Sequence, residues 1–253
     1  MWDENGAKLL QTNSDANENC TGRYALFIPG ETIDLCVPDK AAIELDGWTD
    51  WFNKIPDLQA TQHGIFPNHK ASQLSVLESL YDDDSRIVLL VCDKKTGRAM
   101  GVISLQNISF TQKSAEIAIN IGAPERSTVA PLASLEAMAL ITEHGFEQVG
   151  LQRIFAGQAY PRLSSWNKML ELIGYKTEGI IRQSFVRGQT TEHTVAIACH
   201  YSFYSRIREF RGSLWGSKSV IKALIKRRPK NSQAEKIDLI LQEIEQEHFE
   251  YLF

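Results

Sequence analysis

The fold is decided by Ser114–Gly188, which reads SAEIAINIGAPERSTVAPLASLEAMALITEHGFEQVGLQRIFAGQAYPRLSSWNKMLELIGYKTEGIIRQSFVRG. Residues 114–122 are mostly apolar and predict a buried central strand. Ala133–Phe146 then predicts a long apolar helix, and Leu151–Ala159 predicts a second strand. Ser164–Ile173 predicts a short helix that a Gly-Tyr pair ends. This order favours a mixed α/β fold, with a twisted, partly parallel central sheet and helices on both faces.

Two strand pairs are expected before this stretch. Residues 23–29 and 31–38 read RYALFIP and ETIDLCVP, two apolar runs that a Pro-Gly pair separates. Residues 85–93 and 98–108 flank a DKKTG turn, which is a strong hairpin signal. Between the two pairs, Asp39–Asn53 starts with polar residues and continues with an apolar stripe. That pattern predicts one helix.

The two ends of the chain differ from its centre. Residues 1–21 are rich in Asn, Asp and Ser and predict a flexible N-terminus. Residues 22–204 predict one domain, closed by a last hairpin that ends in TEHTVAIACHY. Residues 205–253 predict a helical C-terminal extension, in which a basic stretch precedes an acidic helix.

The composition excludes several classes of protein. The chain has 253 residues, 43% of them hydrophobic and 23% charged, which is ordinary for a soluble globular protein. A net charge of −4 gives no overall attraction to nucleic acid. The four cysteines show no CxxC or Cys/His spacing, so no zinc site is expected, and those in apolar runs predict buried thiols. We see no signal-peptide pattern and no apolar run of about 20 residues, so we expect a cytoplasmic protein.

The order of elements in Ser114–Gly188 resembles the acyl-CoA-binding half of the GNAT acetyltransferases. It is most similar to the branch that includes the ribosomal-protein N-terminal acetyltransferases, and the resemblance extends from Gly22 to Tyr201. AEIAINI matches the strand in which family members carry a glutamate facing the cleft. The resemblance implies acetyl-CoA as cosubstrate, held in a gap between two parallel strands, and direct attack by a primary amine without a metal.

The phosphate-binding loop departs from the family pattern R/Q-x-x-G-x-G/A. The resemblance places Val129 where Arg or Gln is usual and Leu132 where the middle glycine is usual, whereas Ala133 and Ser134 keep the small size. Backbone amides at the helix start would still hold the pyrophosphate. Arg126 either adds charge to a phosphate or is a solvated loop residue. The resemblance also implies that the strand with Ile119 and Ile121 donates a backbone N–H to the thioester. The residues implied to hold the cosubstrate are therefore Ile119, Ile121, Arg126, Val129, Ala130, Leu132, Ala133, Ser134 and Asn167.

The helix SSWNKML also departs from the family. Its usual Asn-x-x-Ser positions fall at Leu163 and Trp166, so Asn167 or Ser164 would have to replace the lost contact to the pantetheine. The tyrosine that acts as general acid in many members falls at Leu170. That role is therefore absent at this position.

Three residues are candidates for proton transfer. Glu116 is the expected base, and the alternative is a structural ion pair with an arginine such as Arg182. His63 could act as base or simply be an exposed loop residue. Tyr160 could protonate the leaving thiolate or only pack in the core.

The acceptor is expected to meet His63, Phe66 and Trp51, with core packing as the alternative for the tryptophan. The QHGIFPNH loop is polar and aromatic, which favours an amino sugar or a nucleotide-linked amino sugar of surface-polysaccharide synthesis. A protein N-terminus and a non-catalytic acyl-CoA-binding module are the alternatives. Lys218–Lys230 could contact an anionic membrane or pack on the protein, and the acidic helix after it could form a dimer.

Overall fold

The computed structural model describes residues 23–53, 65–80, 82–122 and 130–252. Eight strands form one sheet in the order β1-β2-β3-β4-β5-β6-β8-β7. The strands are β1 (Leu26–Pro29), β2 (Ile33–Cys36), β3 (Ile87–Asp93), β4 (Ala99–Ser109), β5 (Ser114–Ile121), β6 (Arg153–Tyr160), β7 (Lys176–Arg187) and β8 (Thr190–His200). The expected mixed α/β fold and both expected hairpins are confirmed.

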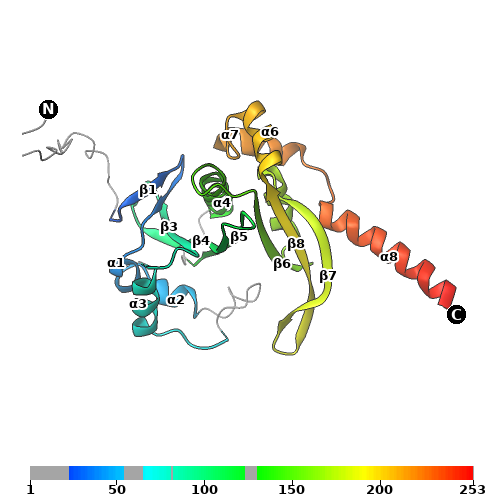
Figure 1. Cartoon of the computed structure of the whole chain (residues 1–253), viewed down its shortest axis with the longest axis horizontal. Helices are drawn as coiled ribbons and strands as arrows, with labels where there is room; N and C mark the ends of the chain where they lie inside the picture. Colours follow the sequence, from blue (N-terminus) through cyan, green and yellow to red (C-terminus); the bar gives the residue numbers. More distant parts are fainter. Residues whose placement is uncertain (1–22, 54–64, 81, 123–129, 253) are drawn as a thin grey trace, which may run out of the picture.

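One strand pair in the sheet is parallel. β5 and β6 run in the same direction, and every other neighbouring pair is antiparallel. The helix α4 (Ala130–Glu147) lies between these two strands in sequence and packs beside them in space (Figure 1). A parallel pair needs such a crossover connection, because the first strand finishes at one end of the sheet and the second strand starts at the other end.

Both faces of the sheet are covered, which explains the unbroken apolar run IVLLVCD in β3. Leu89 and Val91 belong to the core that α4 covers. Leu90 and Cys92 point to the opposite face, where they pack with α1 (Lys40–Glu44), α2 (Trp48–Trp51) and α3 (Lys70–Ser79). The thiols Cys36, Cys92 and Cys199 are buried and free, as the sequence predicts for the last two.

The prediction of one helix over Asp39–Asn53 was wrong. Asp39 caps α1 by accepting a hydrogen bond from the backbone N–H of Ala41 at 2.8 Å, but the helix stops at Glu44. Gly47 lies before α2 with a φ of +81°, in the left-handed region, which interrupts helical geometry. Two short helices therefore replace the long one.

The C-terminal segment contains three helices, α6 (Tyr201–Arg211), α7 (Lys218–Arg227) and α8 (Gln233–Leu252). The first of them starts at Tyr201, four residues before the predicted start of the helical extension at residue 205. Leu214, Trp215 and Ile221 are buried in the core beneath α4. α8 contacts β7 and the short helix α5 (Ser164–Leu170), and its far end extends away from the rest of the protein (Figure 1). Among the described helices, none combines the length and the apolar character that crossing a membrane would require.

Candidate functional site

The parallel strands β5 and β6 separate soon after they start. They pair at only three positions, of which Glu116 opposite Phe155 is the last. Beyond that point β5 continues to Ile121 along β4, and β6 continues to Tyr160 along β8. Among the described residues, the backbone groups of β5 and β6 that face each other beyond this point therefore form no hydrogen bonds between the two strands. Such a row of N–H and C=O groups can bind an extended ligand.

The helix α4 begins at the end of the sheet where β5 finishes. Its first residue, Ala130, follows the end of β5 after residues 123–129, so Arg126 and Val129 lie outside the described residues. A helix start of this kind presents free N–H groups and a partial positive charge, which favour a phosphate. Leu132 packs against the core and Ala133 is fully buried there. The Leu132 side chain is therefore directed at least partly into the core at this helix start.

Two buried amide side chains lie on β6 and on α5, the helix that follows it. Asn167 is only 2% exposed, yet neither its Oδ1 nor its Nδ2 has a hydrogen-bond partner among the described residues. Gln158 is 8% exposed, and its Oε1 is likewise unpaired within those residues. Gln158 lies two residues before the end of β6, and α5, which carries Asn167, starts four residues after that end. Buried polar groups normally have partners, so these two are suited to bind a ligand with amide groups.

Glu116 lies on the face of β5 opposite to α4. Its neighbours Ala115 and Ile117 are buried in the core beneath α4, and successive side chains on a strand alternate between faces. The Glu116 side chain is half-buried, and Asn107 donates a hydrogen bond from Nδ2 to its Oε2 at 3.2 Å. The expected alternative, an ion pair with Arg182, is not formed, because Arg182 pairs with Glu245 at 2.9 Å. The carboxylate therefore keeps free acceptor capacity.

The two tryptophans on the face of Glu116 belong to the core. Trp48 and Trp51 are 3% and 2% exposed, and their rings stack with centroids 6.4 Å apart. Asn120 joins α2 to β5 by donating from Nδ2 to the backbone oxygen of Trp51 at 3.3 Å. Gly122 lies so close to Trp51 that a Cβ there would be 2.3 Å from the ring. Trp51 is thus placed to support this face of β5, and its buried ring is not available to stack on an acceptor.

The other residues expected at the acceptor differ in position. Phe66 is 81% exposed and lies just before α3, so its ring is open to a ligand. His63 lies outside the described residues. No group of three His, Cys, Asp or Glu side chains within the described ranges is arranged to hold a metal ion.

Tyr160, at the end of β6, is bonded to the C-terminal helix. Its hydroxyl donates to Asp238 Oδ2 at 3.2 Å, and burial raises the pKa of the phenol to about 12. Lys168 on α5 also pairs with Glu235 on α8, at 3.0 Å. The first turns of α8 therefore contact both elements next to the gap.

Sequence reasoning missed Gln158 and Asp238. A polar residue within the apolar strand IFAGQAY was a usable signal for Gln158, because it falls at a buried position. Asp238 carries no such signal. Its position follows from the docking of α8, which lies outside the stretch that carries the resemblance.

No family model and no curated protein matches this chain. Solved structures do match. RimJ from Mycobacterium smegmatis, in complex with CoA-disulfide, has a TM-score of 0.60 at 15% identity and covers 80% of this chain and 92% of its own. A GCN5-related N-acetyltransferase from Brucella melitensis scores 0.59 at 20% identity, covering 76% and 86%.

A spermidine N-acetyltransferase from Vibrio cholerae, in complex with CoA and spermine, scores 0.58 at 16% identity and covers 69% of this chain and 98% of its own. Each of the three covers more than two thirds of this chain. The chain has the fold of the GCN5-related N-acetyltransferases, the GNAT fold that its sequence resembles.

Proposed function

We propose that this chain is an acetyl-CoA-dependent N-acetyltransferase that acts on a primary amine. The proposal is supported by the β5–β6 gap, which opens after Glu116, and by two buried amides with unpaired atoms, Gln158 on β6 and Asn167 on the helix that follows β6. When bound, acetyl-CoA supplies the activated acyl group as a thioester. Two similar proteins were solved with CoA-disulfide and with CoA, which supports the same cosubstrate here.

The residues around the gap fit such a cosubstrate. Asn167 and Gln158 offer both donors and acceptors to the amide groups of a pantetheine arm, and pairing would remove the cost of leaving them unsatisfied. The strand end that includes Ile119 and Ile121 offers backbone N–H groups to a thioester carbonyl, where they would stabilise developing negative charge. The start of α4 at Ala130 would hold the pyrophosphate.

Glu116 is the proposed general base. An amine that attacks a carbonyl must lose a proton, and a carboxylate within reach can accept it directly or through water. The hydrogen bond from Asn107 orients one carboxylate oxygen and leaves the other free.

Tyr160 is a poor general acid in this arrangement. Even a cysteine thiol, with a pKa near 8.5, is a much stronger acid than a phenol with a pKa of about 12, so this phenol would protonate a thiolate poorly. We therefore assign Tyr160 a positioning role through Asp238, and solvent protonates the leaving thiolate. His63 remains a predicted base or acceptor contact.

The acceptor that we propose is an amino sugar or a nucleotide-linked amino sugar. The exposed ring of Phe66 offers a face for a sugar or base ring. Residues 65–80, which lead into and form α3, contain one carboxylate, Glu78, whereas a polyamine with several ammonium groups favours more. Polyamines and protein N-termini should be assayed beside amino sugars, because two of the similar structures are a spermidine N-acetyltransferase and RimJ.

Calorimetry with acetyl-CoA, followed by an assay on amino sugars, spermidine and N-terminal peptides, tests the proposal. Glu116→Gln is expected to lower kcat/KM by about 10² to 10⁴-fold and to leave the Kd for acetyl-CoA unchanged. Glu209→Gln, an exposed carboxylate on α6, is the matched control. Absence of acetyl-CoA binding contradicts the proposal. Binding without turnover of any amine supports instead a non-catalytic acyl-CoA-binding module.

A further inference from the structure

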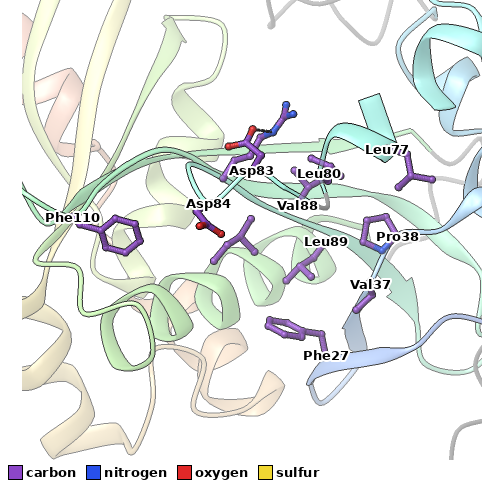
Figure 2. Close-up of a pocket in the computed structure, with 12 residues that line it drawn as sticks. Phe27, Val37, Pro38, Leu77, Leu80, Asp83, Asp84, Val88, Leu89 and Phe110 are labelled. Atoms are coloured by element: carbon purple, nitrogen blue, oxygen red, sulfur yellow. Dashed lines mark ion pairs between the residues drawn. The ribbon is translucent and has the colours of Figure 1, made fainter. Parts of the chain in front are cut away.

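A hollow of about 430 Å³ opens at the other end of the central strands (Figure 2). Its wall is apolar and includes Leu77 and Leu80 from the end of α3, and Val88 and Leu89 from β3. The volume lies within the range of sites that bind small molecules.

The hollow is separate from the proposed active site. Phe110, which lines it, belongs to the turn immediately before β5 starts at Ser114. The β5–β6 gap opens after Glu116 and extends toward Ile121, at the opposite end of the same strand. A ligand in the hollow would therefore not occupy the gap.

Large apolar side chains at the hollow are exposed to solvent. Phe110, Phe27 and Val37 are 62%, 46% and 41% exposed, and all three line the hollow. Two exposed rings beside an apolar wall offer a ligand both contact area and aromatic faces. An apolar body would gain from being buried here.

The charged residues at the hollow leave one carboxylate without a partner. Asp83 and Arg86 neutralise each other, with Arg86 Nε 2.6 Å from Asp83 Oδ2. Asp84 forms no hydrogen bond or ion pair with any described residue. Figure 2 draws its carboxylate between Phe110 and the side chains of the apolar wall. The lining therefore carries one net negative charge, which favours a ligand with one positive charge.

We propose that this hollow is a second binding site, which takes an apolar primary ammonium such as an arylalkylamine. The ammonium would lie at Asp84, and its apolar body would lie against Leu80 and Val88, near the ring faces of Phe27 and Phe110. A cation near these faces gains further from their negative potential. This site goes beyond the proposed acyl transfer, since it requires neither acetyl-CoA nor turnover.

Methyl NMR of the full chain tests the site, with 2-phenylethylammonium as the probe. We expect saturable shifts of the Val37, Leu80 and Val88 methyl groups with a Kd of about 1 mM or tighter. The neutral analogue 2-phenylethanol should bind at least about fivefold more weakly, because it lacks the charge that Asp84 recognises. Asp84→Asn should remove this difference. Asp82→Asn, an exposed carboxylate outside the lining, is the matched control and should keep it.

Three outcomes overturn the proposal. No saturation of the Leu80 and Val88 shifts at about 10 mM probe would show that the hollow does not bind it. Equal affinity for amine and alcohol would show an apolar site without selectivity for charge. Shifts confined to the methyl groups of Ile119 and Ile121 would place the amine in the gap only. Because the readout needs no acyl transfer, failure here is distinct from failure of the proposed function.

Discussion

Replacing Asn167 by leucine should have opposite effects on stability and on cosubstrate binding. The side chain is 2% exposed, and both of its polar atoms are unpaired within the described residues. Burying an unsatisfied polar group costs about 1–3 kcal/mol, so a leucine, which has the same number of side-chain heavy atoms, should stabilise the free protein by about 1–2 kcal/mol. For a chain of this size that corresponds to a rise in Tm of about 2–8 °C. The same change removes the proposed contacts to acetyl-CoA and should weaken binding by about 5- to 30-fold.

The assay combines a thermal unfolding scan without ligand and a calorimetric titration with acetyl-CoA. Asn53→Leu is an unsuitable control because Asn53 forms hydrogen bonds to Asn68. Gln148→Leu, an exposed amide at the end of α4, is the better match and should change neither quantity. A fall in Tm together with unchanged affinity would refute the reasoning. It would mean that Asn167 holds the fold and does not contact the cosubstrate.

Three further predictions concern packing, protonation and the C-terminus. Gly122→Ala should destabilise by about 1–3 kcal/mol, since its Cβ would meet Trp51 at 2.3 Å, whereas Gly179→Ala has open space and should be near neutral in chemical denaturation. Burial lowers the pKa of His144 below its usual 6.5, so stability should fall as pH drops from 6.5 toward the lowered pKa, and His144→Gln should abolish that dependence. A chain that ends at Gln242 should keep its Tm and its acetyl-CoA affinity, because residues 243–252 are exposed and the Arg182–Glu245 ion pair that the truncation removes lies at the surface. A lower mass in light scattering would show that the far end of α8 joins two copies.

The sequence predicted the sheet better than it predicted the helices around it. Apolar runs such as IVLLVCD and the turn that follows it specify β3 and β4 locally, so their bounds were predictable. The break between α1 and α2 depends on the conformation of Gly47, and an apolar stripe continues through it. The start of α6 at Tyr201 precedes the predicted start of the helical extension, because the helix follows β8 without an intervening turn.

At the candidate site, the residues themselves were easier to predict from the sequence than the contacts that they make. Glu116 and Asn167 could be selected from the resemblance and from their spacing. Contacts between distant segments bury Trp51 beneath Gly122 and bond Tyr160 to Asp238. Periodicity in one segment carries no information about which other segment will cover it.

The three residue pairs that join β5 to β6 have a mechanical consequence. They divide the sheet into a five-stranded body and a three-stranded body, connected by this short seam and by α4. A ligand that fills the space beyond Glu116 would tie the two bodies together along the rest of the strands. Occupancy should therefore stiffen the whole protein, and amide hydrogen exchange in residues 156–160 of β6, which have no partner on β5, should slow when acetyl-CoA is added.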